Sequence, residues 1–185
     1  MSARIALLRA VNVAGHGMVS MSDLRELLAA LGYRDAKTVL QSGNAVFAGT
    51  ARSDGALETL LEKEAFERLG LRTVFFVRTV DEWADVVARN PFANEAKRDP
   101  ARLAVVFLKS APRPAAVAAL RAAVKGPEVI RAGSRHVYVT YPDGMGRSKL
   151  TGALIEKTLG TVGTARNWNT VLKLAAVAEE RVSTG

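Results

Sequence analysis

Two polar motifs follow or connect predicted strands in the first half of the chain. The first is Arg9-Ala10-Val11-Asn12-Val13-Ala14-Gly15-His16-Gly17, and the second is Gln41-Ser42-Gly43-Asn44. In a split β-α-β unit the first and second strands are parallel, so both motifs emerge at one end of the sheet. Together they would bind an anion or polar ligand through guanidinium, amide, hydroxyl and backbone N–H groups. The candidate ligand-binding residues are Arg9, Asn12, Gln41, Ser42 and Asn44. Ordinary turn chemistry is the alternative for each motif taken alone.

A third motif, Arg166-Asn167-Trp168-Asn169-Thr170, stands where the closing helix is predicted to begin. Either asparagine would cap that helix, with the tryptophan packed beside the cap. A planar guanidinium at this point also suits bidentate recognition of phosphate or carboxylate. We therefore weigh a ligand-binding role equally with a structural one for four residues: Arg166, Asn167, Trp168 and Asn169.

A weaker signal is the segment Asp143-Gly144-Met145-Gly146-Arg147-Ser148-Lys149. Glycines before a basic helix start favour anion binding, here by Arg147, Ser148 and Lys149. The spacing of a P-loop is not met, so nucleotide hydrolysis is not predicted. The alternative is a Tyr141-Pro142-Asp143-Gly144 turn followed by a capped helix.

Known catalytic sets are missing from the sequence. The absence of cysteine excludes disulfides, thiol catalysis and cysteine-ligated metals. The two histidines, His16 and His136, are too few and too far apart in sequence for a histidine-rich metal site. Two runs of acidic residues in the first half fit solvated helix faces: Glu58 with Glu62, and Asp81 with Glu82 and Asp85. The sequence identifies no catalytic residue, and we predict no metal or cofactor.

Apolar spacing predicts the elements that must position these motifs. In the first half they are a strand at 5–8, a helix at 24–31, strands at 38–41 and 45–48, a helix at 57–69, a strand at 73–77 and a trailing helix at 81–89. Ser22 is the expected cap of the first helix and Gly32 its stop. Asn90-Pro91 ends the trailing helix, since proline disfavours helical geometry in the preceding residue.

The second half repeats this order. The predicted elements are a strand at 103–108, a helix at 115–124, strands at 129–131 and 136–141, a helix at 148–159, a strand at 162–165 and a closing helix to about 181. This predicts an α+β fold of two tandem ferredoxin-like β-α-β-β-α-β units, each with a trailing helix. The expected halves are residues 1–93 and 101–185, with a junction at 94–100.

The positive charge is confined to the second half. The chain has 185 residues and a net charge of +8; residues 1–100 are balanced, whereas residues 101–185 hold 13 Lys and Arg against 5 Asp and Glu. A one-sided positive field attracts polyanions or phosphorylated small molecules, although a solvated arginine-rich surface is the alternative. No apolar run approaches the roughly 20 residues of a membrane span, and no secretory signal is evident. We expect a cytoplasmic protein that does not bind membranes.

At its polar motifs the chain resembles the bacterial proteins called domain of unknown function 1697. Members typically carry Arg-Gly-Ile-Asn-Val-Gly-Gly after the first strand, a Gln-Ser-Gly-Asn turn, and Arg-Asn-Trp-Asn-Thr before a Val-x-Lys-Leu helix. The matching residues here are Arg9, Asn12, Val13, Gly15, Gln41, Ser42, Gly43, Asn44, Arg166, Asn167, Trp168, Asn169, Thr170, Val171, Lys173 and Leu174. Ala10 and Ala14 depart from the pattern. The resemblance implies a two-lobed α+β fold of ferredoxin-like halves without an established activity.

The leading functional hypothesis is a binding protein for a phosphate-bearing anionic partner, either nucleic acid or a nucleotide-like molecule. The predicted strands lack the aromatic signature of RNA-recognition sheets, which weighs against RNA. The alternative is a small-molecule enzyme with a polar site between the lobes that acts on an anionic substrate. The missing nucleophile and base weigh against that enzyme. A purely structural interaction module is a third possibility, and it predicts a large exposed apolar patch.

Overall fold

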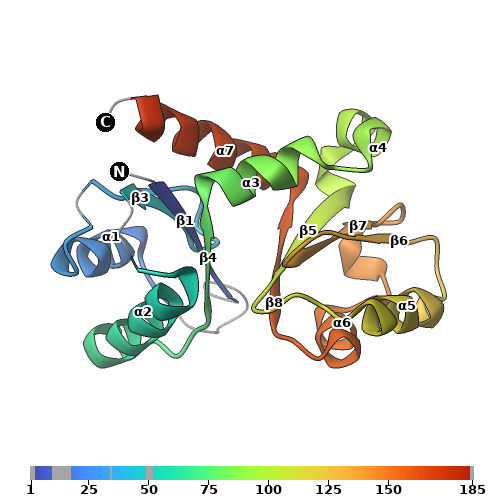
Figure 1. Cartoon of the computed structure of the whole chain (residues 1–185), viewed down its shortest axis with the longest axis horizontal. Coiled ribbons are helices and arrows are strands. Elements are labelled where there is room, and N and C mark those ends of the chain that lie inside the picture. Colours follow the sequence, from blue (N-terminus) through green and yellow to red (C-terminus); the bar gives the residue numbers. More distant parts are fainter. Residues whose placement is uncertain (1–2, 10–17, 34, 49–51, 184–185) are drawn as a thin grey trace. The chain divides into compact units, whose positions relative to one another are not determined.

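The computed structural model describes residues 3–9, 18–33, 35–48 and 52–183 (Figure 1). By its packing contacts the chain divides into unit 1, Met1–Val87 with Lys173–Gly185, and unit 2, Ala88–Leu172. Each unit contains a four-stranded antiparallel sheet, and the described residues form seven α-helices in total. The predicted α+β class is confirmed.

Unit 1 follows the order β-α-β-β-α-β and then a further helix. Its elements are β1 Ala3–Leu8, α1 Met21–Ala30, β2 Lys37–Thr38, β3 Asn44–Ala48, α2 Asp54–Leu69, β4 Phe75–Thr79 and α3 Val80–Ala88. The strand order in its sheet is β2-β3-β1-β4. The first and last strands of the unit therefore pair with each other, and β1 lies between β3 and β4.

Unit 2 repeats this order after a short helical segment. Its elements are α4 Ala93–Arg98, the 3₁₀ turn η1 Pro100–Arg102, β5 Leu103–Leu108, α5 Pro114–Ala123, β6 Val129–Ala132, β7 His136–Thr140, the 3₁₀ turn η2 Met145–Arg147, α6 Gly152–Leu159, β8 Gly163–Asn167 and α7 Trp168–Ser183. The strand order is β6-β7-β5-β8. Strand β5 has the predicted bounds 103–108. Helix α7 begins in unit 2, and its residues from Lys173 onward belong to unit 1.

The start of α1 differs from the prediction. The cap is Ser20 rather than Ser22, because the Ser20 hydroxyl accepts the Asp23 N–H at 3.0 Å while the Asp23 carboxylate accepts the Ser20 N–H at 3.4 Å. This reciprocal pair is a capping box, which satisfies two N–H groups at the helix start. The helix therefore begins at Met21, three residues before the first leucine of the apolar pattern.

Strand β2 is shorter than the predicted 38–41 strand. Leu40 has φ of 61°, a left-handed conformation that interrupts extended backbone. Pairing with β3 therefore stops early, although the Val39 N–H still donates to the Asn44 carbonyl at 2.9 Å. Residues 39–43 form a loop instead of the second half of a strand.

Helix α6 begins at Gly152, four residues after the predicted start. The cap is Thr151, whose hydroxyl accepts the Leu154 N–H at 3.2 Å. The preceding glycine-containing segment forms the single turn η2 instead. Ser148 and Lys149 therefore lie in the connection before the helix rather than in its first turn.

The expected junction is helical in part. Residues 94–98 belong to α4, within unit 2. The packing-based division differs from the expected ranges 1–93 and 101–185 in two respects, since it falls after Val87 and returns residues 173–185 to unit 1. The Lys37–Glu180 ion pair, at 3.1 Å, links β2 to α7 within unit 1.

Both faces of the sheet in unit 1 are buried. On one face Ala6, Leu8, Phe47 and Phe75 pack with the leucines of α1 and α2, which cover this face together (Figure 1). On the other face Ile5, Leu7, Val46 and Phe76 are fully buried as well. Burial of each large apolar side chain contributes about 1.5–3 kcal/mol, so continuous apolar runs suit these strands better than alternation.

The sheet in unit 2 is built the same way. Val106, Leu108 and Val139 share a core with Leu120 of α5 and Ile155 of α6. On the opposite face Val105, Phe107 and Tyr138 are also buried. The two units also share an equivalent backbone hydrogen bond at the end of the first strand. The Leu8 N–H donates to the Gly43 carbonyl at 2.8 Å, and the Leu108 N–H donates to the Arg135 carbonyl at 2.9 Å.

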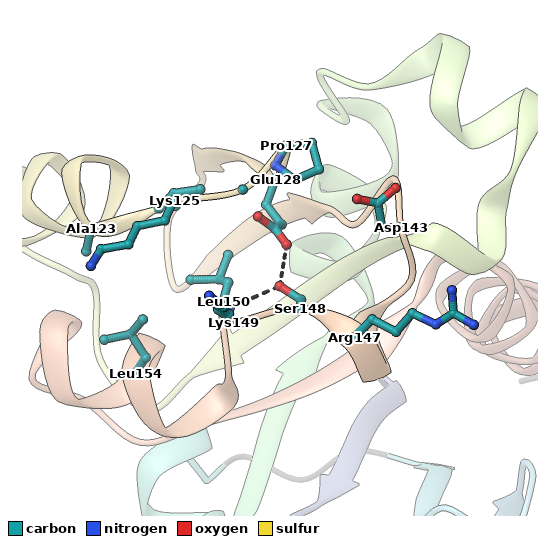
Figure 2. Close-up of a pocket in the computed structure, with 12 residues that line it drawn as sticks. Ala123, Lys125, Pro127, Glu128, Asp143, Arg147, Ser148, Lys149, Leu150 and Leu154 are labelled. Atoms are coloured by element: carbon teal, nitrogen blue, oxygen red, sulfur yellow. Dashed lines mark hydrogen bonds between the residues drawn. The ribbon is translucent and has the colours of Figure 1, made fainter.

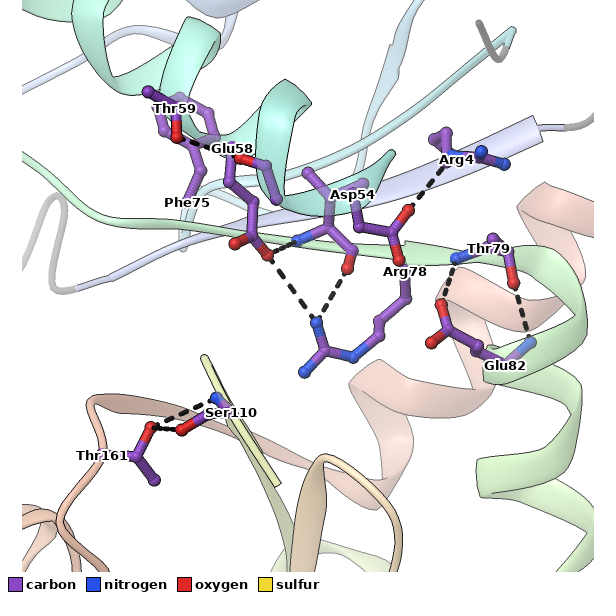
Figure 3. Close-up of polar contacts among 12 residues, drawn as sticks. Arg4, Asp54, Glu58, Thr59, Phe75, Arg78, Thr79, Glu82, Ser110 and Thr161 are labelled. Atoms are coloured by element: carbon purple, nitrogen blue, oxygen red, sulfur yellow. Dashed lines mark hydrogen bonds and ion pairs between the residues drawn. The ribbon is translucent and has the colours of Figure 1, made fainter. Parts of the chain in front are cut away.

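Carboxylates occupy the free edge of the sheet in unit 1. The outward N–H groups of β4 donate to three side chains: Phe75 to Glu62 at 3.0 Å, Val77 to Glu58 at 2.8 Å and Thr79 to Glu82 at 2.9 Å. Figure 3 shows the contacts of Glu58 and Glu82. An edge whose donors are taken cannot pair with another strand. The prediction of a solvated face was wrong for Glu58, which is only 4% exposed and lies 3.8 Å from the Arg78 guanidinium.

We predict that Glu58→Ala lowers the free energy of unfolding by about 3–5 kcal/mol, because it removes a buried ion-pair partner and the acceptor of the Val77 N–H. Chemical denaturation measures this change. The matched control is Glu67→Ala, which removes an exposed partner of Lys63 at 3.8 Å and should cost no more than about 1 kcal/mol. Equal effects of the two substitutions would contradict a special role for Glu58.

Candidate functional site

The backbone places Arg9, the first residue of the first polar motif, next to the Gln41–Asn44 turn at one end of the sheet in unit 1. The hydrogen bond from Leu8 to Gly43 joins the end of β1 to the Gln41–Asn44 turn, and the Arg9 N–H donates to Val74 at 2.9 Å. The Arg9 carbonyl also accepts the Thr73 hydroxyl at 2.9 Å. Asn12 and His16 lie outside the described residues.

The Asn44 side chain holds the loop before β3. Asn44 is fully buried, and its amide donates to the Val39 carbonyl at 2.7 Å and to the Ser42 hydroxyl at 2.9 Å. Gly43 has φ of 77°, which favours glycine. Gln41 and Ser42 are exposed. The turn chemistry considered in the sequence therefore accounts for Gly43 and Asn44, and Gln41 and Ser42 are the accessible members of this motif.

Arg166 is a buried side chain of β8. Its Nη1 donates to the Thr164 hydroxyl at 2.9 Å and to the Ala165 carbonyl at 2.9 Å. Burial lowers the pKa of the Arg166 guanidinium to about 10, because desolvation penalises the charged form. These two hydrogen bonds anchor Nη1 to its own strand.

Arg78 occupies the equivalent position in unit 1. Arg78 pairs with Ile5 of β1 as Arg166 pairs with Val105 of β5, and its Nη1 donates to the Val77 carbonyl at 2.7 Å. Each arginine therefore binds the carbonyl of the residue that precedes it on the last strand of its unit. This recurrence favours a structural role for the arginine of the third motif.

The rest of the third motif starts α7. The Asn167 carboxamide oxygen accepts the Thr170 N–H at 3.0 Å and the Thr170 hydroxyl at 3.1 Å, so Asn167 is the cap. Trp168 is buried, at 5% exposure, whereas Asn169 is exposed. Of the two candidate caps considered in the sequence, the structure selects Asn167.

His136 is the only histidine among the described residues, and it packs against aromatic side chains. His136 is buried on β7, against Tyr138 at 4.9 Å and Phe107 at 6.4 Å between ring centroids. Its exposed fraction is 8%. A side chain at Gly133 would collide with the imidazole. Within the described ranges no group of three or more His, Asp or Glu is placed to hold a metal ion.

Unit 2 contains a pocket of about 590 Å³. It is lined by the end of α5, by segment 125–128, by the turn at Asp143 and by residues between Arg147 and Leu154. Figure 2 shows Lys125 on one side of this pocket and Arg147 on the other, with the Arg147 guanidinium directed away from Glu128. The weak anion-binding candidates Arg147, Ser148 and Lys149 therefore come together in one concave site.

Glu128 and Ser148 form the central polar contact of the pocket. The Ser148 hydroxyl donates to one Glu128 carboxylate oxygen and accepts the Leu150 N–H at 3.0 Å (Figure 2). Ser148 has a single hydroxyl proton, which it donates to Glu128, while its oxygen accepts the Leu150 N–H. These two bonds together fix the orientation of the hydroxyl and of the Glu128 carboxylate. Ser148 thus positions the carboxylate.

The charged groups of the pocket are not neutralised by ion pairs. Among the described residues Lys125, Arg147 and Lys149 form no salt bridge, and Glu128 and Asp143 have no basic group within 4.0 Å. Val124, Leu150 and Leu154 supply apolar lining. Unneutralised charges around an apolar pocket are typical of a ligand site.

The sequence motifs did not identify Lys125 or Glu128. A usable signal was present, because Glu128 is the only acidic residue between Asp99 and Asp143 in a strongly basic stretch. Its partner Ser148 lies twenty residues further along the chain. The contact between Glu128 and Ser148 therefore forms only when the β6-β7 hairpin brings the segments before and after it together.

The Tyr141 phenol lies at the edge of this network. Its hydroxyl donates to the Leu150 carbonyl at 3.4 Å. Burial, and to a smaller extent the negative charge of Glu128, raises the pKa of Tyr141 to about 12. Both effects disfavour the phenolate.

We predict that the folded protein loses stability as pH rises from about 10, the ordinary tyrosine pKa, through about 12. The raised folded-state pKa of Tyr141 contributes stability that is fully present below pH 10. The pKa of Tyr141 is measured by ultraviolet absorbance titration, as the difference between the titration curves of the wild type and of Tyr141→Phe. Glu128→Gln should lower this pKa only in part, since burial is the larger cause. A Tyr141 pKa of 10 or lower would contradict the claim that burial of the phenol raises its pKa.

We predict that Asn167→Ala lowers the free energy of unfolding by about 0.5–2 kcal/mol, because the start of α7 loses its cap. Asn169→Ala is the matched control and should change stability by less than about 0.5 kcal/mol, since Asn169 is exposed. Denaturant titration of both variants measures the difference. A larger loss for Asn169→Ala would show that the cap had been assigned to the wrong asparagine.

Across the described ranges no helix is long and apolar enough to cross a membrane.

Comparison with solved structures finds a protein of similar fold. A solved structure of the conserved bacterial protein SP0830 from Streptococcus pneumoniae is similar, with 21% identity, a TM-score of 0.75 and coverage of 96% of this chain and 98% of that chain. This likeness concerns the fold alone.

No curated protein matches the chain. The profile of the family DUF1697, described as a protein of unknown function, matches residues 1–138. This span covers most of the sequence and includes the first two polar motifs. The resemblance inferred from the motifs is therefore confirmed, and the chain belongs to the DUF1697 family.

Proposed function

We propose that this protein binds a phosphate-bearing, nucleotide-like anion in the unit 2 pocket. The observation that carries the proposal is the pocket of about 590 Å³ with three basic side chains, Lys125, Arg147 and Lys149, in its lining. Its volume lies within the range of small-molecule sites. No ion pair with a described residue neutralises these cations, so their charge is available to a phosphate.

The lining suits a ligand with two chemically different ends. Lys125, Arg147 and Lys149 offer hydrogen-bond donors and positive charge to a phosphate. Val124, Leu150 and Leu154 offer apolar surface to a ring. A nucleotide joins an anionic group to a flat heterocycle, and the basic second half of the chain would favour its approach.

Nucleic acid is the competing partner. Sheets that bind RNA stack bases on exposed aromatic side chains. Here Phe76 of unit 1 and Phe107 and Tyr138 of unit 2 are buried on their sheet faces. This burial removes the usual stacking surface, so a small ligand in a pocket has better support.

We also infer that each unit is a ferredoxin-like split β-α-β unit with a trailing helix. The support is the repeated β-α-β-β-α-β order and the matching strand orders β2-β3-β1-β4 and β6-β7-β5-β8. Helices α3 and α7 follow the last strand of each repeat directly. An experimental structure in which β1 or β5 lay at a sheet edge would contradict this assignment.

We predict that nucleoside 5′-triphosphates raise the melting temperature of the protein. The double variant Lys125→Ala/Lys149→Ala should bind them roughly tenfold or more weakly, because charge-assisted hydrogen bonds are lost. At about 100 times its dissociation constant a ligand adds roughly 2.7 kcal/mol of stability. Thermal shift and equilibrium dialysis provide the two measurements.

Lys157→Ala is the matched control, since Lys157 is an exposed lysine of α6 outside the pocket lining. It should leave nucleotide affinity unchanged. Equal weakening by the control and the double variant would indicate general charge attraction rather than the pocket. Tight binding of oligonucleotides with a steep salt dependence, unaffected by the double variant, would favour nucleic acid on another surface.

A further inference from the structure

We propose that Glu128 makes the unit 2 pocket selective for a guanine base, a conclusion that rests on the proposed binding of a nucleotide-like anion there. Glu128 is half-buried in the pocket lining, and Ser148 engages one of its two carboxylate oxygens. Figure 2 shows the other oxygen on the side of the pocket where Leu150 and Lys125 lie. Nothing in the predicted motifs or the family description assigns this carboxylate a role.

An ionised carboxylate only accepts hydrogen bonds, so it selects ligands that donate. Taking it out of water is costly unless donors replace the lost hydration. Among the described residues Ser148 is its only hydrogen-bond donor, and no basic group lies within 4.0 Å. A ligand that covers the pocket must therefore bring N–H groups to Glu128.

Guanine matches this demand better than the other bases. Its pairing edge presents two adjacent donors, the ring N1–H and the exocyclic amine, which can meet a carboxylate in the two-point geometry that arginine uses. Adenine offers only its amine beside a ring nitrogen that is itself an acceptor. Uracil flanks one N–H with two carbonyl oxygens that repel a carboxylate. A hypoxanthine base keeps N1–H but lacks the amine.

The charge of the lining favours a base over a cationic ligand. A guanidinium or ammonium compound would also satisfy Glu128, but Lys125, Arg147 and Lys149 outnumber the two acidic groups of the pocket. A guanine nucleotide satisfies both requirements, because its uncharged pairing edge donates to Glu128 and its phosphate is attracted by the basic side chains. Leu150 and Leu154 provide apolar surface for the ring.

Gly126 gives the carboxylate its space. A Cβ atom at this position would collide with the second oxygen of Glu128. The backbone at Gly126 and the hydroxyl of Ser148 thus restrict the carboxylate from two sides. Ser148 is the positioning residue, since it acts on the base only through Glu128.

The test compares GMP, IMP and AMP in equilibrium dialysis, with inorganic pyrophosphate as a base-free competitor. Wild-type protein is expected to bind GMP roughly tenfold or more tightly than IMP or AMP, as expected when a charged group loses a hydrogen bond. Glu128→Gln should abolish this preference, because the amide accepts from Ser148 but replaces the second oxygen with a donor. Pyrophosphate should compete in Glu128→Gln at least as well as in the wild type, because the substitution removes a negative charge from the pocket.

Ser148→Ala provides the readout of positioning, and it should reduce the GMP preference while pyrophosphate competition stays unchanged. Glu179→Gln, an exposed carboxylate of α7 in unit 1, is the control and should bind as the wild type does. Melting temperatures of all variants confirm that they are folded.

The outcomes separate the two proposals. Equal affinity for GMP, IMP and AMP, with binding still weakened by Lys125→Ala and Lys149→Ala, overturns guanine selectivity and keeps the phosphate site. A GMP preference that persists in folded Glu128→Gln overturns the role of Glu128. No binding of any nucleotide or of pyrophosphate overturns both proposals.

Discussion

The free edges of the two sheets set the main constraint on this structure. A buried strand edge must find acceptors for its outward N–H groups. In unit 1 Glu58 and Glu62 of α2 accept from β4, and in unit 2 Glu156 of α6 accepts the Gly163 N–H of β8 at 3.0 Å. These bonds fix α2 and α6 along their sheets, and the position of α6 in turn fixes the segment from Ser148 to Leu154 that lines the pocket.

In the folded structure some side chains of the polar motifs hydrogen-bond within the protein, whereas others are exposed to solvent. Asn44 closes a loop, Asn167 caps α7, and Arg166 binds the Ala165 carbonyl as Arg78 binds the Val77 carbonyl. Buried polar groups normally have such partners. The ligand-binding potential of unit 2 therefore lies in the glycine-containing segment that the sequence indicated only weakly.

The sequence was sufficient for the class of fold and the order of elements, because long apolar runs such as Leu103–Leu108 and the leucine spacing of α2 reflect burial directly. The boundaries depended on side-chain caps at Ser20 and Thr151 and on the left-handed Leu40, which apolar spacing does not reveal. The pocket was beyond local patterns, since Glu128 meets Ser148 only after the chain has formed the β6-β7 hairpin.

The most direct measurement of the central claim is a crystal structure of the protein with GMP. The account predicts electron density in the unit 2 pocket, with the phosphate near Lys125 or Lys149 and the guanine pairing edge against Glu128. Density for the nucleotide at another surface, or a pocket that stays empty while solution measurements show GMP bound, would contradict it.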